Sequence, residues 1–505
     1  MKHTKLVLAI AATLTATASF SALALDLYVD SKTKQIYTEA AIGRHKLGSF
    51  EQVNSNHKGV DDFSDKVHQE LDSQKAHIEN DIALQNNSIK ALEEKSEALQ
   101  LTTKGSTKVS MDSKGLQVES ADKKYKFKLG GRIHAEAGFH DGDTGYGTTT
   151  AGKFTPADAN DGTDVRRARM RMEGVFGQDW LFRTEADFAA EKVQMKDVYI
   201  QYLGSKWATI TVGQQKQNFS RELQESSNDM MFTERSLMNM LNDPIVDRAI
   251  GLNAEHFGKN YVAKFGIFGN SITPPTAAGS DEGWAGSSRL TWAPIMEKTK
   301  LVHLGVAGNY RQVDDNGEVA KAKGFSLTNK TTNFSGYDPI NTKVTNVNDI
   351  GMLGLEGGAI YGPFSMGAEY TRSWVDRKNG DKDLTFDGWY VDAGYTITGE
   401  SRTYKNGNFT YLKPNKPFGK GGLGAWELAG RYSQANLDKN VQTTSFKGSD
   451  IGNMTIALNW YVNENVRFMA DYMRYIDSSN SLYKTSSGNS INDLNVYTLR
   501  GQVAF

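Results

Sequence analysis

The chain ends in the segment NVYTLRGQVAF, residues 495–505, and this segment decides the fold class. Tyr497, Leu499, Val503 and Phe505 fall on one side of a two-residue repeat, and the other side is polar and includes an arginine. A two-residue repeat is the side-chain period of a β-strand. The segment therefore predicts a strand with one apolar, aromatic face and one polar face.

The same repeat returns along most of the chain after Thr102. We predict about sixteen strands, an even number as in an up-and-down membrane barrel. They lie near 125–139, 165–176, 180–188, 195–203, 207–217, 249–257, 261–269, 284–293, 301–311, 351–361, 364–374, 389–398, 425–435, 453–461, 465–475 and 495–505. Tight turns alternate with long polar loops, except that the 189–194 connection is short and the 399–424 connection is long.

Composition excludes several other classes of protein. The 505 residues include 58 basic and 59 acidic ones, a formal charge of −1, which argues against a nucleic-acid-binding protein. Mean hydropathy is −0.52, and beyond the N-terminal apolar run no stretch of about 18 apolar residues occurs, so membrane helices are not expected. The chain is rich in glycine and aromatic residues, with 49 Gly, 21 Tyr and 23 Phe. This enrichment is typical of strands that face lipid on one side and water on the other.

No sequence feature predicts an enzyme, a metal site or a cofactor. Cysteine is absent, which removes disulfides, thiol nucleophiles and Cys-ligated zinc. None of the nine histidines has the spacing of a metal ligand or of a catalytic pair, and no nucleotide-binding loop is present. We expect His134, His256 and His303 to be ordinary lumen or rim residues.

A sheet in lipid must close on itself, because each unpaired backbone group at an open edge costs several kcal/mol there. About sixteen strands leave a water-filled lumen, whereas about eight would be filled by side chains. The terminal Phe505 also resembles the C-terminal signature of outer-membrane barrels. We therefore predict an all-β, transmembrane antiparallel barrel that is preceded by a short α-helical coiled-coil segment.

Alternation assigns side chains to lipid or lumen, since a charge on the lipid face costs roughly 2–4 kcal/mol at the midplane. In 165–176 the methionines Met170 and Met172 go to lipid, which sends the arginines between them inward. The 218–248 loop, with helical content around 230–241, is expected to fold inward and narrow the lumen. The candidate anion-binding residues are Arg132, Arg167, Arg169, Arg171, Arg183, Arg235, Arg289 and Asp197. The secondary lumen cations are Lys126, Lys128, Lys264, Arg221, Arg311, Arg431, Arg467 and Arg500.

The N-terminal part divides into three expected segments. Residues 1–24 have a charged start, an apolar run and a small-residue cleavage site, and so predict a signal peptide. Residues 25–55 are a polar lead with no clear period, residues 56–104 are predicted to form a periplasmic coiled coil, and residues 105–505 form the barrel.

The coiled coil rests on a heptad repeat. Leu71, Ile78, Leu92 and Leu99 recur at multiples of seven, with one four-residue stutter near Val67. Such a polar helix is too short to be stable alone, so we expect it to assemble with copies of itself. The alternative is a single amphipathic helix that packs on the barrel.

Five stretches and an arginine pair carry a family resemblance that runs from about Gly115 to Phe505. They are GLQVESADKKYKFKLGGRI (115–133), Arg166-Arg167, VHLGVAGNYR (302–311), GESRTYKNGNFTYLKP (399–414) with GAWELAGRYS (424–433), and LNWYVNENVRFMADY (458–472). The chain resembles the phosphate-selective porin O and P family. The resemblance implies a trimeric sixteen-stranded barrel with an arginine ladder and a central anion site, and it places Arg132, Arg167, Arg235, Arg289 and Asp197 among the pore residues. Where the central lysines would stand, this chain has Leu181, Leu223, Asp376 and Thr385.

The resemblance implies passive diffusion of small anions, with phosphate as one candidate, through a homotrimer in the outer membrane among lipid and lipopolysaccharide. No nucleic-acid partner is expected. A general porin of weak ion selectivity stays open, because lumen acids are nearly as numerous as the cations and could pair with them. A third alternative is a structural, adhesin-like protein in which the trimeric stalk is the functional part. We expect the stalk to be periplasmic and within reach of peptidoglycan.

Overall fold

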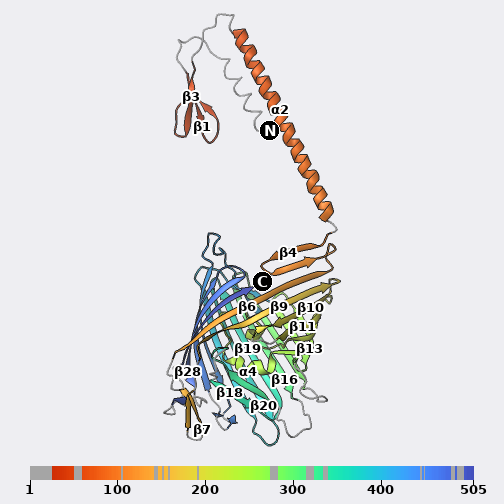
Figure 1. Ribbon diagram of the computed structural model, residues 1–505, viewed down its shortest axis with the longest axis vertical. Helices are drawn as coiled ribbons and strands as arrows, with labels where there is room; N and C mark the ends of the chain where they lie inside the picture. The colour runs from red at the N-terminus through yellow and green to blue at the C-terminus, as the bar shows by residue number, and fades with distance from the viewer. Residues whose placement is uncertain are drawn as a thin grey trace. The chain divides into compact units, whose positions relative to one another are not determined.

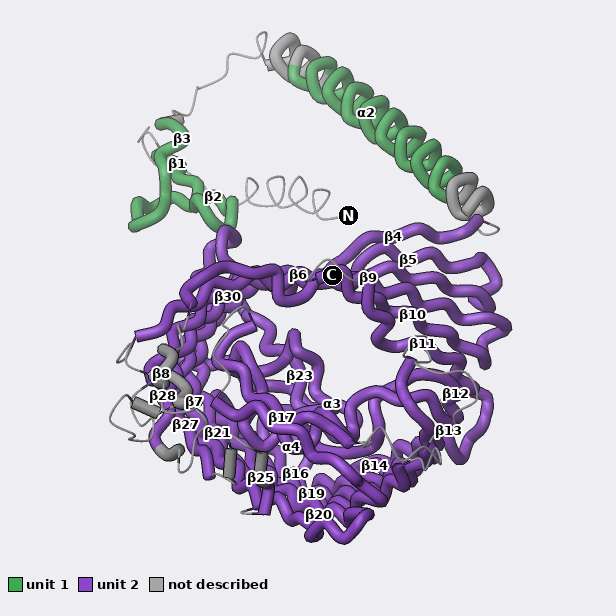
Figure 2. The backbone as a smooth tube through the Cα atoms, turned by 60° about the horizontal axis from the view of Figure 1, so that its bottom comes forward, with its two compact units in different colours: residues 1–102 green, residues 103–505 purple. Residues whose placement is uncertain are grey.

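The computed structural model describes residues 25–50, 60–103 and most of 106–505 (Figure 1). The residues outside this description are 1–24, 51–59, 104–105, 142–145, 151–152, 157–159, 190–192, 273–282, 314–323, 334–338, 439, 444–445, 448–449, 479–483 and 486–493. The expected signal peptide thus lies outside the described residues. The chain divides into two compact units, residues 1–102 and 103–505 (Figure 2).

Within the described part of the second unit, sixteen antiparallel strands close into a barrel. In chain order they are β6 (Lys126–Asp141), β9 (Gly162–Phe176), β10 (Trp180–Asp187), β11 (Gln194–Tyr202), β12 (Thr209–Lys216), β13 (Arg248–Phe257), β14 (Tyr261–Phe268), β15 (Ala285–Met296), β16 (Lys300–Gln312), β19 (Val347–Tyr361), β20 (Phe364–Arg377), β21 (Leu384–Thr396), β24 (Ala425–Asn436), β27 (Asp450–Tyr461), β28 (Val466–Ser478) and β30 (Asn495–Ala504). Each strand pairs with the next in chain order, and each overlaps a strand that the alternation predicts. The predicted fold class is confirmed.

The barrel closes where β30 meets β6. Residues 132–141 of β6 pair with β30, and the Phe505 that follows β30 pairs with Gly131. The Phe505 amide donates to the Gly131 carbonyl over 3.0 Å, and the Gly131 amide donates back over 2.8 Å. A Cβ atom on Gly130 would lie 2.6 Å from the Phe505 carbonyl oxygen, so only glycine fits beside this junction. The C-terminal residue is thus part of the closing seam.

A hairpin that the sequence did not predict extends the sheet beside the first residues of β6. It consists of β4 (Lys108–Asp112) and β5 (Gly115–Glu119), and β5 pairs with the first residues of β6. Ser113 at its tip donates to the Glu464 carboxylate over 2.9 Å, and Lys413 binds the same carboxylate. These two hydrogen bonds lower the pKa of Glu464. Since Glu464 lies in the tight turn between β27 and β28, the chain enters the barrel at the end that carries short turns.

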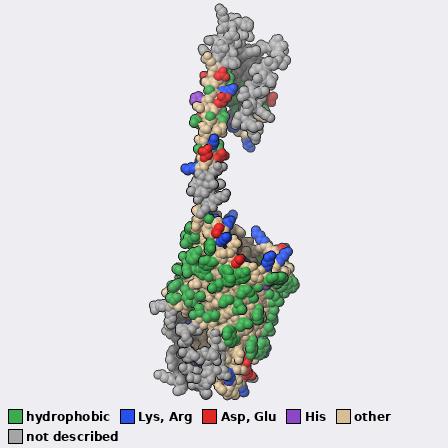
Figure 3. Space-filling view, turned by 90° about the vertical axis from the view of Figure 1, so that its right-hand side faces the viewer, with side chains coloured by type: hydrophobic (Ala, Val, Ile, Leu, Met, Phe, Trp, Pro, Cys, Tyr) green, Lys and Arg blue, Asp and Glu red, His purple; other side chains and the backbone are tan. Residues whose placement is uncertain are grey.

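The outer face of the barrel is apolar, as the face assignment predicts. Hydrophobic side chains cover the outer wall seen in Figure 3. Met170, Leu252, Leu290 and Leu499 each have roughly half of their surface exposed although they lie at mid-strand. Such a continuous exposed apolar surface is compatible with lipid as the surrounding solvent.

Inserted segments occupy part of the barrel interior, and two of them bear on the functional site (Figure 2). The loop between β12 and β13 folds inward, as predicted, and carries α3 (Arg221–Gln224) and α4 (Met238–Val246). A hairpin of β22 (Thr403–Lys405) and β23 (Asn408–Thr410) enters from the turn end within the long 399–424 connection. The two inserts meet where the Arg221 guanidinium lies 4.8 Å from the centre of the buried Phe409 ring.

The helices of the inward loop differ from the prediction, which placed helical content around 230–241. Residues 230–237 are irregular, because arginines of the barrel wall bind their backbone carbonyls. Arg467 donates to the Met230 carbonyl over 2.7 Å, and Arg431 donates to the Glu234 carbonyl over 3.0 Å. A helix would need those same acceptors for its own backbone hydrogen bonds.

The first unit contains a small sheet and one long helix. The lead, in which the sequence shows no clear period, forms β1 (Leu25–Asp30), β2 (Ile36–Tyr37) and β3 (Arg44–Phe50), in the order β2-β1-β3. Strands this short show only two or three repeats of the alternation, which explains why the sequence did not reveal them. The expected stalk is the helix α2 (Val60–Thr103). Among the described residues, no helix has the length and apolarity needed to span a bilayer.

Candidate functional site

The inner face of β6, β9 and β10 is basic. Alternation on these strands places more basic than acidic side chains toward the lumen. Among them are Lys128, Arg132, Arg167, Arg169, Arg171 and Arg183, together with Glu136, Glu173, Glu185 and Asp187. The lipid-facing neighbours on β9 are the exposed Met170 and Met172, which have the outward direction that the alternation predicts.

One water-accessible part of this wall is a cluster around Glu173. Lys128 and Arg183 are the cross-strand partners of Glu173 on its two sides. Arg183 forms an ion pair with Glu173, and the Arg171 guanidinium lies 3.8 Å from the same carboxylate. The Arg171 and Arg183 side chains are 26% and 30% exposed, although both face the barrel interior. Three cations thus surround the Glu173 carboxylate at a place that water reaches, and Arg183 also lies 3.9 Å from Asp197. We call Lys128, Arg171, Glu173 and Arg183 the Glu173 cluster.

Next to this cluster, two arginines are balanced by two acids. Arg132 donates to Glu185 over 3.0 Å, and Arg169 donates to Glu185 over 3.1 Å and to Asp187 over 2.7 Å. Arg132 also donates to the hydroxyl groups of Ser226 and Ser227 in the inward loop. This network positions the loop but adds no net charge to the lumen.

Arg167 is the least neutralised of the buried cations. The structure gives it no hydrogen bond among the described residues, its Nη1 atom is buried without a partner, and the nearest carboxylate, Glu234, lies 4.0 Å away. Glu234 instead binds Arg166 over 2.6 Å. Both arginines face inward because the β6–β9 register shifts at His134, so that Arg166 is an extra residue on β9.

Four of the predicted lumen cations bind the inward loop rather than facing water. Arg221 lies in the loop itself and pairs with Glu225, Glu369 and Asp392. Arg431 pairs with Glu222, while Arg467 and Arg500 donate to the loop carbonyls of residues 230 and 233. All four are at least 95% buried, so their role in the structure is to hold the loop.

Arg289 is also removed from water. It donates to both oxygens of Glu356 over 2.7 Å and to the Gly407 carbonyl of the β22–β23 hairpin over 2.8 Å. Gly407 has a φ of +80°, and a Cβ atom there would lie 2.9 Å from the Thr291 hydroxyl. Glycine at the hairpin turn therefore permits the close approach that buries Arg289.

Arg402 ties both inserts to the wall. It donates to the two oxygens of Glu427 over 2.8 and 2.7 Å and to the Asp229 carbonyl of the inward loop over 2.9 Å. Glu427 is fully buried and also accepts from Tyr461 over 2.8 Å. The Arg402–Glu427 pair therefore anchors both inserts on the β24 side of the barrel, while Arg132 of β6 and Arg166 of β9 bind the inward loop from the basic wall.

Residues 127–505 match the family described as phosphate-selective porin O and P. The chain belongs to this family. Porin O of Pseudomonas aeruginosa is 27% identical over 409 residues, which cover 74% of this chain and 88% of that protein. An uncharacterized protein of Caulobacter vibrioides is 27% identical over 369 residues, which cover 70% of this chain and 69% of that protein.

Two solved porin structures are among those that match the chain. In vitro folded OmpT of Vibrio cholerae gives a TM-score of 0.48 at 12% identity and covers 76% of this chain and 98% of its own. The anion-selective porin from Comamonas acidovorans gives a TM-score of 0.47 at 12% identity and covers 75% of this chain and 100% of its own. Family and barrel together make this porin an outer-membrane channel and not an enzyme.

The remaining predicted site residues of the porin each bind a partner within the barrel or at its rim. Asp197 on β11 binds Arg248 over 2.7 Å and approaches Arg183 to 3.9 Å. Arg235 donates to the Glu222 and Glu225 carbonyls of its own loop. Lys264 pairs with Glu255 over 2.6 Å, Lys126 pairs with Glu119 at the rim over 3.3 Å, and Arg311 donates to the Gly269 carbonyl over 3.3 Å.

Sequence reasoning missed three arginines of the porin interior. Arg248 stands one residue before the predicted start of its strand, and Arg402 lies in the 399–424 stretch that did not fit the turn pattern. Arg166 fell on the lipid side of the alternation, because a bulge leaves no mark in a single sequence. The described residues contain no group of His, Asp or Glu side chains that could hold a metal ion.

Proposed function

We propose that this porin conducts small anions along the wall formed by β6, β9 and β10. The observation that carries the proposal is the Glu173 cluster, in which Lys128, Arg171 and Arg183 lie around one carboxylate and remain accessible to water. Rings or rows of Arg and Lys favour anions in a pore, and a low-dielectric wall focuses their field. At an effective dielectric constant of 20, one uncompensated charge attracts an anion at 4 Å by about 4 kcal/mol.

Arg167 is buried as deeply as the arginines that hold the inward loop, but it lacks their partners and therefore supports a second contact for an anion deeper in the wall. Its guanidinium lacks a close carboxylate, and its cationic neighbours Arg166 and Arg500 add to the local positive field. Guanidinium groups bind phosphate or carboxylate oxygens in pairs. The candidate anion-binding set is thus reduced to Lys128, Arg167, Arg171 and Arg183, with the other predicted cations holding the inserts.

Phosphate is one candidate solute, and the family description and the relative named Porin O support it. The replaced lysines, with Leu181 and Leu223 near the lumen, favour weaker binding than a dedicated phosphate site would give. A second candidate is a general porin of low selectivity, favoured by the balanced network of Arg132, Arg169, Glu185 and Asp187.

We also propose a segment order for the mature protein. It comprises a removed signal peptide at 1–24, a lead at 25–55, a coiled coil at 56–104 and the barrel at 105–505. The chain enters the barrel at the short-turn end, where Ser113 binds Glu464. Short turns of bacterial barrels face the periplasm, which supports a periplasmic helix within reach of peptidoglycan.

The helix α2 supports a homotrimer in the proposal. Its heptad residues Leu71, Ile78, Ile82 and Leu92 are all more than half exposed in the single chain. A seam of this kind becomes stable when it packs against copies of itself. Because one chain already closes a full barrel, the proposal assigns transport to the barrel and assembly to the stalk, which leaves the adhesin-like alternative without support. Lipid and lipopolysaccharide are the expected surroundings.

The test is a reversal-potential measurement in planar bilayers with a KCl gradient. Replacement of Arg171 and Arg183 by Gln removes two charges of the Glu173 cluster and should lower the chloride-to-potassium permeability ratio. Arg377→Gln is the control for loss of positive charge elsewhere, because this arginine pairs with Asp381 outside the cluster. Equal ratios in all three proteins would defeat the proposal, and phosphate that fails to block the chloride current would remove phosphate as a bound solute.

A further inference from the structure

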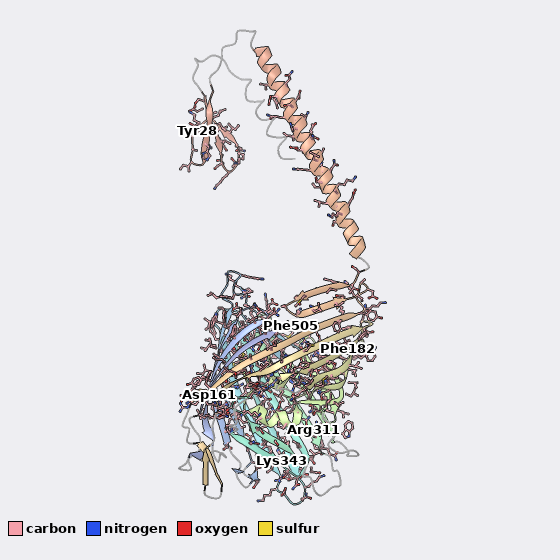
Figure 4. The ribbon with its side chains drawn as sticks, viewed as in Figure 1. Tyr28, Asp161, Phe182, Arg311, Lys343 and Phe505 are labelled. Atoms are coloured by element: carbon pink, nitrogen blue, oxygen red, sulfur yellow. The ribbon has the colours of Figure 1, made fainter. Side chains whose placement is uncertain are left out.

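The small N-terminal sheet has one polar and one apolar face, and the division follows the strand pairing. Tyr28 on β1 is the cross-strand partner of Tyr37 on β2 and of Lys46 on β3, so these three side chains share a face. Figure 4 labels Tyr28 in this sheet. Val29, the next residue on β1, pairs with Ile36 and His45, which therefore share the opposite face.

The polar face is closed by its own interactions. Lys46 binds the Asp26 carboxylate over 2.8 Å, and Ser49 donates to the same carboxylate. The Arg44 guanidinium lies 3.4 Å from the centre of the Tyr37 ring. These contacts satisfy the charged groups of this face without any partner from outside the sheet.

The other face lacks such closure. It carries Leu27, Val29 and Ile36 together with His45, and Ile36 is 49% exposed. None of the described side chains from 26 to 49 is buried. An antiparallel sheet of alternating character normally covers its apolar face with another layer, and a segment of this size needs disulfides, a metal or association to stay folded. Cysteine is absent from the chain.

The neighbouring helix indicates what covers the face. Phe50 ends the sheet and Val60 begins α2, so the sheet is tied to the helix by residues 51–59. Such a tether spans roughly 30 Å at most. When the exposed heptad seam of α2 assembles, copies of the sheet are held at an effective concentration of the order of millimolar. Each copy then meets identical apolar faces before it meets any other protein.

We propose that residues 25–50 are a trimerisation element, in which three copies of the sheet pack their Leu27–Val29–Ile36 faces together at the N-terminal end of the coiled coil. The proposal rests on the coiled-coil assembly put forward above. A threefold arrangement turns the three polar faces outward, so the Asp26–Lys46 ion pair and the Arg44–Tyr37 contact form the outer surface of the cap. The apolar side chains of the three copies then bury one another's surface, and the charged groups of the polar faces stay in water.

The experiment uses the absence of cysteine in the full-length porin. Ile36→Cys and Tyr37→Cys place one thiol on the apolar and one on the polar face, at adjacent positions of β2. Ile82→Cys, on the helix seam, reports coiled-coil assembly independently. The three proteins are folded into detergent micelles or native outer membrane, oxidised with copper phenanthroline, and analysed on non-reducing denaturing gels.

The proposal predicts a covalent dimer from Ile36→Cys, because a disulfide can join two of the three chains near the axis. Its yield should exceed that of Tyr37→Cys about tenfold, since thiols whose Cα atoms lie more than about 7 Å apart cannot be bridged. Val29→Cys, opposite Ile36, is the second variant on the apolar face and should behave like Ile36→Cys. Ile82→Cys should also form the dimer.

Two results overturn the proposal, and they are distinguishable from failure of the assembly itself. Dimer from Ile82→Cys, with none from either Ile36→Cys or Val29→Cys, shows that the helices assemble while the apolar face packs elsewhere, on its own helix or on the cell wall. Equal dimer yields from Ile36→Cys and Tyr37→Cys show that the two faces are not distinguished. Absence of dimer from all the variants removes the coiled coil and the cap together, and leaves the pore proposal untouched.

Discussion

Removal of Arg402 should free the inserts of the barrel and enlarge the pore. Arg402 is bidentate to Glu427, which is fully buried, and also holds the Asp229 carbonyl of the inward loop. Removing one partner of a buried ion pair costs about 3–5 kcal/mol, because the other charge is left buried and uncompensated. In Arg402→Met the stranded carboxylate of Glu427 can regain water only if the β22–β23 hairpin and the loop move away from it.

The assay is single-channel conductance, together with the temperature at which the barrel unfolds on a denaturing gel. Arg402→Met should raise conductance and its noise and lower the unfolding temperature. The double variant Arg402→Met/Glu427→Leu removes both charges and should recover most of the stability. Lys413→Met is the matched control, since its exposed pair with Glu464 contributes less than about 1 kcal/mol. Wild-type conductance and unfolding temperature in Arg402→Met would refute the reasoning.

Three further predictions concern single positions. Gly407→Ala should raise conductance and destabilise the hairpin by about 1–2 kcal/mol, because its φ of +80° disfavours a side chain and the added Cβ meets the barrel wall; unchanged conductance would count against the insert. Gly130→Ala should lower the unfolding temperature of the barrel, whereas Gly357→Ala, with open space at its Cβ, should not; equal effects would mean that the closing seam does not depend on Gly130. Hydrogen bonds from Lys46 and Ser49 lower the pKa of Asp26, so its carboxylate stabilises the N-terminal sheet at pH values above the usual aspartate range, and this contribution is lost as the pH falls through the lowered pKa. Limited proteolysis within residues 26–50 should therefore accelerate only in strong acid. Acceleration already at pH 6 would contradict this assignment.

The barrel could be predicted from the sequence because lipid enforces a rule on each strand. Met170 and Met172 must face outward, so the arginines beside them must face inward, and sixteen strands follow from the repetition of that rule. No such solvent acts on residues 25–50, where two or three alternations in a polar context gave no recognisable period. The sheet of β1, β2 and β3 was missed for this reason.

The interior was less predictable than the wall. The alternation sent Arg171, Arg289 and Arg467 inward alike, but only the inserted segments decide which of them meets water. Arg171 is 26% exposed, whereas Arg289 and Arg467 are sealed beneath the β22–β23 hairpin and the inward loop. The Arg166 bulge and the hairpin turn at Gly407 depend on contacts between distant strands, which no local pattern records.

The most direct test of the account is the zero-current potential of the purified porin across a tenfold KCl gradient in a neutral bilayer. The three cations around Glu173 on the lumen wall predict that chloride crosses the barrel faster than potassium, so the anion sets the sign of the zero-current potential. This preference for chloride should weaken at high salt concentration, because salt screens the charges. A potential of the opposite sign at low salt would show that the basic wall does not govern conduction.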